Sequence, residues 1–98
     1  MDEIPSRDGC ALVTGGGIRL GAAIVRRLVS EGWPVAIHAR KAATATPLAQ
    51  ELTVQGHKVA VVEGDLSDAN VAEKIFTQVR EKFGQCTFLV NSAAAFAY

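Results

Sequence analysis

The sequence predicts an α/β fold built on a parallel sheet. Four short apolar runs alternate with three segments whose apolar residues recur at helical spacing. The runs are continuously apolar, which is typical of parallel strands buried on both faces. Alternating strands and helices are joined by right-handed crossovers, and a doubly wound sheet then has the strand order 3-2-1-4. We therefore expect a Rossmann-like doubly wound sheet of four strands with three helices.

The strands are expected at about 10–14, 34–39, 58–63 and 87–91. The first helix, at about 19–31, has an apolar stripe that includes Ile24, Val25, Leu28 and Val29. It is predicted to end at Gly32, because glycine readily adopts the left-handed conformation that closes a helix.

The second helix is predicted to start with Thr46 as its N-cap and Pro47 at its first helical position, and to stop at Gly56. The segment 42–46 before it is interpreted as a plain linker. The third helix is predicted to begin near 67–68 and to end at Gly84. Its apolar face carries four residues: Val71, Ile75, Val79 and Phe83.

Composition excludes several classes of protein. The chain has 98 residues, enough for one domain at most, and its 49% hydrophobic and 20% charged residues argue against disorder. Ten basic and ten acidic side chains give a net charge of zero, and the sequence has no basic stripe typical of nucleic-acid binding and no polybasic segment typical of membrane binding. Residues 1–5 are acidic and polar, unlike a signal peptide. We therefore expect a cytoplasmic protein with no nucleic-acid or membrane partner.

The two cysteines, Cys10 and Cys86, stand at the starts of two predicted strands. Their thiols are close if those strands are neighbours, and reduced cysteines are expected in a cytosolic α/β protein. No Cys/His spacing suggests a zinc site, so no metal is expected.

A glycine cluster at 15–17 lies between the first strand and the first helix. Glycines there allow a tight turn, a close approach to a ligand, and N–H groups aimed at a phosphate. The general G-x-G-x-x-G pattern counted from Gly15 would need glycine where Leu20 stands, and a P-loop would need Gly-Lys-Ser/Thr. The turn therefore indicates a dinucleotide site of another kind, or a tight turn with no ligand.

The run from Thr14 to Gly21 resembles Thr-Gly-x-x-x-Gly-x-Gly, the turn of the short-chain dehydrogenase/reductase family, with Arg19 in place of the middle glycine. An Arg-Leu-Gly ending is similar to the pteridine reductase branch. The resemblance covers the chain from about Cys10 onward. It implies cofactor binding by five residues of the turn: Gly15, Ile18, Arg19, Leu20 and Gly21.

The second strand is followed by Arg40 and Lys41, with His38 just before them. In NAD-binding folds an acidic residue at this position hydrogen-bonds the ribose hydroxyls, whereas an arginine can bind the 2′-phosphate of NADP. We therefore expect NADP(H) as the cofactor, with His38 and Lys41 as additional donors. The same arginine argues against a methyltransferase, whose related fold also needs an acidic residue here for the ribose. The alternative to phosphate binding is that these residues form a solvated basic loop.

The third strand is followed by Asp65 and Leu66. In short-chain reductases an Asp followed by an aliphatic residue at this place meets the adenine, so the resemblance implies that role for both residues. The alternative is that Asp65 and Asp68 only cap the third helix.

The fourth strand ends in Asn91, Ser92 and Ala93, where the family usually has Asn-Asn-Ala-Gly. The resemblance implies that Asn91 braces the sheet and that the three residues border the cofactor's ribose and nicotinamide. Pteridine reductases follow with a phenylalanine that stacks on the pterin, and Phe96 fits that position. Phe96 and Arg19 are thus expected to bind substrate, with a core aromatic as the alternative for Phe96.

The family transfers hydride with a serine, a tyrosine and a lysine placed after the fourth strand. Tyr98 has nothing after it, so no residue of this chain is predicted to be catalytic. We expect residues 1–98 to be the NADP-binding N-terminal part of a reductase of pterin-like or related carbonyl or imine substrates. The remaining part is expected on the same or a second polypeptide, and the family's usual tetramer is expected as well. The alternative is a stand-alone, non-catalytic dinucleotide-binding or interaction module.

Overall fold

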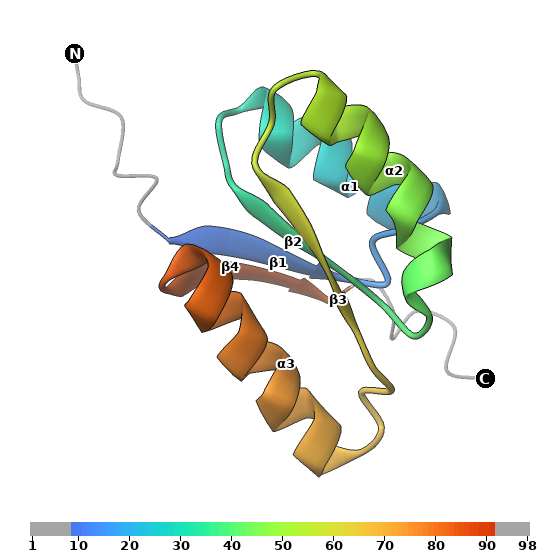
Figure 1. Ribbon diagram of the computed structural model, residues 1–98, viewed down its shortest axis with the longest axis vertical. Coiled ribbons are helices and arrows are strands. Elements are labelled where there is room, and N and C mark those ends of the chain that lie inside the picture. The colour runs from blue at the N-terminus through green and yellow to red at the C-terminus, as the bar shows by residue number, and fades with distance from the viewer. Residues whose placement is uncertain (1–8, 92–98) are drawn as a thin grey trace.

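A parallel sheet in the strand order β3-β2-β1-β4 forms the centre of the computed structural model, which describes residues 9–91 (Figure 1). The strands are β1 (Cys10–Thr14), β2 (Val35–Ala39), β3 (Val59–Glu63) and β4 (Cys86–Asn91). The helices are α1 (Arg19–Ser30), α2 (Ala42–Val54) and α3 (Ala69–Phe83). All three pairs of neighbouring strands are parallel, and the chain crosses from β3 at one edge of the sheet to β4 at the other. This arrangement confirms the predicted fold class and strand order.

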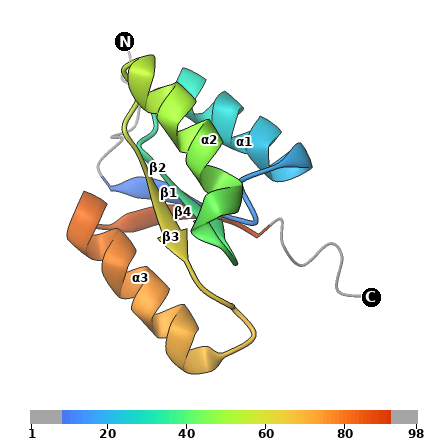
Figure 2. The ribbon, with the colours of Figure 1, turned by 45° about the vertical axis from the view of Figure 1, so that its right-hand side comes forward.

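The sheet lies between two helical layers, with α1 and α2 on one face and α3 on the other (Figures 1 and 2). Successive side chains of β1 point to opposite faces, as a strand requires. Ala11 and Val13 belong to the core that α1 and α2 cover, whereas Cys10 and Leu12 belong to the core under α3. The continuous apolar character of the central strands follows from this double burial.

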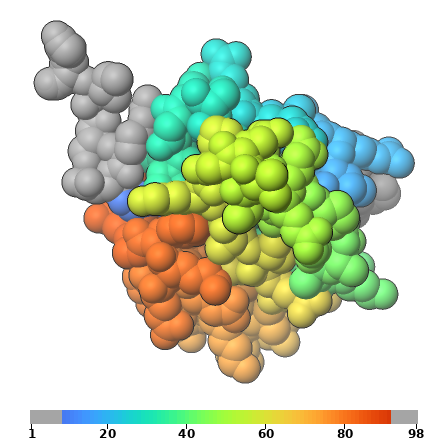
Figure 3. Space-filling view, turned by 45° about the horizontal axis from the view of Figure 1, so that its top comes forward, coloured from blue at the N-terminus to red at the C-terminus, as the bar shows by residue number. Residues whose placement is uncertain are grey.

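The central strands and the edge strands differ in burial. Every residue of β1 and β2 is buried, whereas β3 reaches the surface between α2 and α3 (Figure 3). The β4 edge is the more open one, because Phe88 is 44% and Leu89 50% exposed. The ring of Phe88 rests on Trp33, with 5.7 Å between the ring centroids. An open edge with exposed apolar side chains is a surface that proteins ordinarily cover.

The start of α2 corrects a prediction. The helix begins at Ala42 with Lys41 as its N-cap, so 42–46 is its first turn and no linker, and Pro47 lies inside it. The hydroxyl of Thr46 donates to the carbonyl of Ala42 at 2.9 Å, within the helix, and caps nothing. The first N–H of the helix, that of Ala42, donates instead to the Glu63 carboxylate at 2.8 Å. This cap could not be predicted from local sequence patterns, because Glu63 is distant from Ala42 in the sequence.

The other helix boundaries agree with their predicted signals. The Asp68 carboxylate accepts from the N–H of Asn70 at 2.9 Å and caps α3. Gly32, just past α1, has φ +94° and Gly84, at the end of α3, has φ +85°. Ile75 and Val79 of the predicted apolar face are buried, and Val71 and Phe83 pack against them in the same core.

Cys10 and Cys86 are register partners on β1 and β4, and both thiols are free. Burial, reinforced by the neighbouring Cys86 thiol, raises the pKa of Cys10 to about 11. A thiol with so high a pKa is almost wholly protonated at neutral pH, so Cys10 behaves as a small apolar core residue.

Candidate dinucleotide-binding site

The predicted site residues within 9–91 lie at one edge of the sheet, where the strands end. The carboxyl ends of parallel strands share an edge, and here the order β3-β2-β1-β4 reverses direction between β1 and β4. A crevice at such a switch point is where open α/β sheets bind their ligands. The loops after β1, β2 and β3 and the end of β4 meet there.

The glycine-rich turn after β1 is tight and lies close to α1. Gly15 has φ +65°, a left-handed conformation that glycine adopts at no steric cost. Gly21 is buried in the first turn of α1, where a Cβ would collide with the carbonyl oxygen of Gly15. Glycine at both positions therefore allows the helix to start directly beside the turn.

The N-terminus of α1 is open to an anion. Its N-cap, Ile18, has no side-chain hydrogen bond to the helix, and the first turn contains no acidic residue. The first helical residue is Arg19, which adds a full positive charge to the partial charge of the helix end. Ile18 and Leu20 are 54% and 61% exposed, so the apolar side chains beside this helix end remain accessible. The arrangement fits the pyrophosphate of a dinucleotide.

Arg19 has a backbone φ of +55° and is the only non-glycine residue of the described ranges with a positive φ. It stands where the resembling motif has its middle glycine. A side chain in this conformation costs roughly 1–2 kcal/mol, and such strain is found mostly at functional positions. The sequence located Arg19 in the turn but did not indicate this conformation.

His38 is the penultimate residue of β2 and is buried, with only 2% of its surface exposed. Its Nδ1 accepts from the N–H of Gly15 at 3.1 Å, and its Nε2 lies 2.8 Å from the carbonyl oxygen of Gly64. The backbone carbonyl of His38 accepts from the N–H of Gly16 at 2.9 Å. Both ring nitrogens thus have partners inside the protein.

Arg40 and Lys41 are exposed in the short connection between β2 and α2, so their charged groups are accessible to a ligand. Glu63, at the end of the neighbouring strand, was missed. Its carboxylate accepts from the Ala42 N–H and so occupies the start of α2. A glutamate that ends a strand carries no sequence signal of this contact.

Asp65 is exposed in the loop between β3 and α3, and its Oδ1 accepts from both the N–H and the hydroxyl of Ser67, at 2.9 and 2.8 Å. These hydrogen bonds, with a smaller contribution from the charge of Arg40, lower the pKa of Asp65, so the carboxylate is charged at neutral pH. Leu66 packs partly against the core under α3. Asp65 therefore stabilises its own loop through Ser67, and its charge also interacts with that of Arg40.

Asn91, the last residue of β4, accepts at Oδ1 from the hydroxyl of Thr14 at 2.8 Å. This contact joins the ends of β1 and β4 across the switch point, and Thr14 was missed as its partner. The remaining predicted residues at this end, Ser92, Ala93 and Phe96, lie outside the described residues.

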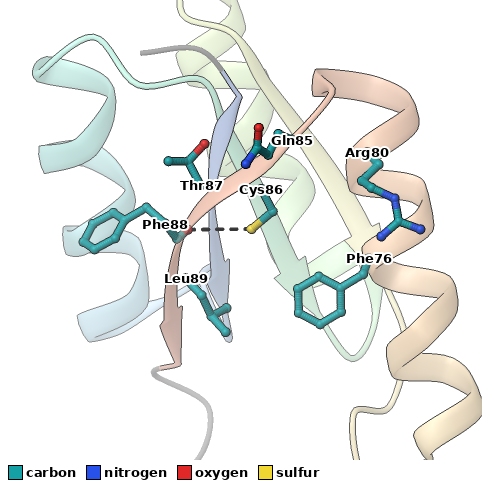
Figure 4. A pocket seen from close by; sticks show the side chains of 7 residues that line it. All are labelled: Phe76, Arg80, Gln85, Cys86, Thr87, Phe88 and Leu89. Atoms are coloured by element: carbon teal, nitrogen blue, oxygen red, sulfur yellow. Dashed lines mark hydrogen bonds between the residues drawn. The ribbon is translucent and has the colours of Figure 1, made fainter. Parts of the chain in front are cut away.

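A groove of about 370 Å³ lies between α3 and β4, away from the candidate site, toward the amino end of β4 (Figure 4). Phe76 points from α3 toward β4, and the Cys86 thiol donates to the carbonyl oxygen of Phe88 at 3.9 Å, whereas the ring of Phe88 points to the opposite side of the strand. The groove is continuous with the open β4 edge. It contains none of the predicted cofactor-binding residues.

The fold is that of a doubly wound α/β protein, with the candidate site at its switch point. The family model described as short chain dehydrogenase matches residues 9–97, and the chain belongs to this family, whose members are oxidoreductases. The short-chain dehydrogenase/reductase eriH of Hericium erinaceus is 36% identical over 92 residues, which are 90% of this chain and 36% of that protein. The cis-1,2-dihydrobenzene-1,2-diol dehydrogenase of Pseudomonas putida is 38% identical over 88 residues, 90% of this chain and 31% of that protein.

Among solved structures, FolM alternative dihydrofolate reductase 1 from Brucella suis, in complex with NADP, superimposes with a TM-score of 0.82 and 35% identity. The match covers 93% of this chain and 38% of FolM. This similarity agrees with the resemblance to the pteridine reductase branch. The chain thus spans roughly a third of the length of the relatives it matches.

Two further features concern the described part of the chain. None of the helices α1 to α3 is long and apolar enough to cross a membrane. Within residues 9–91, no three His, Cys, Asp or Glu side chains are grouped so that they could hold a metal ion.

Proposed function

We propose that this chain is the NADP(H)-binding part of a short-chain reductase, acting on a pterin-like or related carbonyl or imine substrate. The observation that carries the proposal is the uncapped N-terminus of α1, next to Arg19 and at the switch point of the sheet. Anion binding at a helix start of this kind is the common element of dinucleotide sites. The 35% identity to an NADP complex of FolM supports the choice of cofactor.

Each loop at the site has a separate task in this proposal. Gly15, Ile18, Arg19, Leu20 and Gly21 form the turn and helix start that hold the pyrophosphate. Arg40 and Lys41 bind the 2′-phosphate, and Asp65 with Leu66 faces the adenine. Asn91, Ser92 and Ala93 border the ribose and nicotinamide, and the bound cofactor supplies the hydride.

The substrate proposal rests on Arg19 and Phe96. Arg19 keeps its strained backbone at the mouth of the site, where its guanidinium can reach both an anionic cofactor group and a substrate carbonyl. Phe96 follows the fourth strand at the position where a flat heterocycle needs an apolar partner, and such stacking contributes roughly 0.5–1.5 kcal/mol beyond burial. The folate reductase named among the similar structures favours a pterin-like substrate.

The catalytic serine, tyrosine and lysine are proposed to lie in a further part of the reductase, on the same or a second polypeptide. The exposed side chains of Phe88 and Leu89 support this, because a covering segment would bury them. The family's homo-tetramer, a small-molecule substrate and a cytoplasmic location complete the proposal.

The cofactor proposal is tested by replacing the arginine proposed to meet the 2′-phosphate. In the complete protein, Arg40→Asp should weaken NADPH binding about 10- to 100-fold, the value of one charge-assisted hydrogen-bond pair, while NADH binding changes little. Titration calorimetry with both cofactors measures this. A variant with unchanged preference between the two would show that Arg40 does not select the cofactor.

The alternative of a non-catalytic nucleotide-binding module is separated by activity. The complete protein with NADPH should oxidise the cofactor when a dihydropterin or dihydrofolate is added, as followed by the loss of absorbance of the reduced nicotinamide. Binding of NADPH without turnover of any pterin, imine or carbonyl compound would favour the module instead.

A further inference from the structure

His38 is joined to two loops by its imidazole. A carbonyl oxygen can only accept, so Nε2, 2.8 Å from the Gly64 carbonyl, carries the proton. Nδ1 is then the unprotonated nitrogen, as it must be to accept from the N–H of Gly15 at 3.1 Å. Only the neutral ring with its proton on Nε2 makes both contacts.

The residue holds the glycine-rich turn through its backbone as well. The N–H of Gly16, next to Gly15, donates to the His38 carbonyl at 2.9 Å. Two successive N–H groups of the turn are therefore directed to His38 and away from any ligand. The Nε2 contact fixes Gly64, which begins the loop that carries Asp65. One buried residue thus links the loops after β1 and β3 to the end of β2.

We propose that His38 is a positioning residue that sets the path of the glycine-rich turn, and that it does not donate to the 2′-phosphate. This rests on the proposed function, because the turn is taken to hold the pyrophosphate. The pyrophosphate is common to NADPH and NADH, whereas the 2′-phosphate belongs to NADPH alone. A residue that acts through the turn affects both cofactors equally, and a phosphate donor affects only NADPH.

The test compares His38→Phe with His57→Phe in the complete protein. Phenylalanine keeps the ring of His38 and removes both hydrogen bonds. His57, the other histidine, lies in the connection between α2 and β3 at the opposite edge of the sheet, and serves as the matched control. We expect His38→Phe to weaken NADPH and NADH binding by the same factor, about tenfold or more, and His57→Phe to change neither. A loss confined to NADPH, or no loss, would overturn the proposal.

Two amide variants test the individual contacts if His38→Phe does not fold. The oxygen of asparagine takes the place of Nδ1, whereas the amide nitrogen of glutamine takes the place of Nε2. His38→Asn should therefore retain more cofactor affinity than His38→Gln, and the reverse order would overturn the proposal. If His38 served only the overall stability of the fold, the losses of cofactor affinity in the two variants would follow their losses in melting temperature.

Hydrogen–deuterium exchange without cofactor distinguishes a failure of this proposal from a failure of the proposed function. Peptides spanning 12–20 should exchange faster in His38→Phe than in the unsubstituted protein, while peptides of α3 exchange at the same rate. Equal exchange in the turn would overturn the positioning role. Failure of the unsubstituted protein to bind either dinucleotide would overturn the proposed function, and the exchange rates would still decide whether His38 holds the turn.

Discussion

The backbone of Arg19 predicts a conflict between stability and binding at a single residue. Its φ of +55° is strained for any side chain, and glycine removes the strain. Arg19→Gly should therefore raise the free energy of unfolding by up to about 1 kcal/mol, since the greater freedom of glycine in the unfolded chain offsets part of the gain. The same change should weaken NADPH binding about 10- to 100-fold by removing a charged partner. Urea unfolding and calorimetry measure the two effects.

Arg19→Ala is the control that separates backbone from side chain. Alanine removes the guanidinium but keeps a Cβ in the left-handed conformation, so binding should fall as it does in the glycine variant without the gain in stability. Equal stabilities of the two variants would contradict the strain described for this residue.

At the residue scale, the sequence indicated which residues gather at the candidate site, but it did not indicate their contacts with one another. Glycines and arginines in a strand–turn–helix context mark a phosphate site because backbone N–H groups and positive charge are required there. The bonds of His38 could not be predicted, because their partners, Gly15 and Gly64, are distant in sequence and depend on how the loops fold. Asn91, expected to brace the sheet, accepts a hydrogen bond from Thr14 on the neighbouring strand, a partner that the sequence did not indicate.

At the element scale, the start of α2 depends on the neighbouring strand. The Glu63 carboxylate accepts from the first N–H of the helix, the position where an N-cap or an anion stabilises a helix end. Glu63→Ala should lower the free energy of unfolding by about 0.5–1 kcal/mol. Thermal unfolding followed by circular dichroism measures the change.

Glu63→Gln is the matched variant for this contact. The glutamine carbonyl still accepts from Ala42, so at least half of the lost stability should be recovered. Equal losses for alanine and glutamine would mean that the charge, and not the hydrogen bond, stabilises the helix start.

The start of α2 was predicted at the wrong residue because contacts with other elements determine it. Thr46 and Pro47 form a strong local signal for the beginning of a helix, and proline inside a helix leaves one carbonyl without its usual donor. Tertiary contacts outweigh that signal: Ala45 is fully buried in the core under α1 and α2, and Glu63 caps Ala42. Strands and the other two helices were predicted closely because their apolar periods and caps are local.

For the whole molecule, the open β4 edge predicts self-association of the 98-residue chain. Leu89 is 50% exposed on β4, which within residues 9–91 has a paired strand on one side only. Leu89→Lys should reduce light scattering of the chain expressed alone, because an edge lysine discourages strand pairing. The control is Val54→Lys, which adds the same charge at a residue 87% exposed on α2. Equal improvement by both variants would attribute the effect to net charge and contradict a role for the β4 edge.

The topology of the sheet was predictable at this scale because right-handed crossovers and strand alternation leave few arrangements. The exposed fractions of the β4 side chains could not be predicted from the sequence, because they depend on how the elements of the fold pack against that strand. The groove between α3 and β4 was likewise absent from any local pattern.

The central position of β1 implies an order of folding. In the register, Ala11 pairs with Val35 on one side and with Phe88 on the other, so the second pairing closes a far longer loop of chain than the first. Longer closures cost more entropy and form later. We therefore expect β1, β2 and β3 to assemble first through their short crossovers, and β4 to join last. The switch point at the carboxyl ends of β1 and β4 would then form only in the final step, and a nascent chain would bind the proposed dinucleotide only after the sheet is complete.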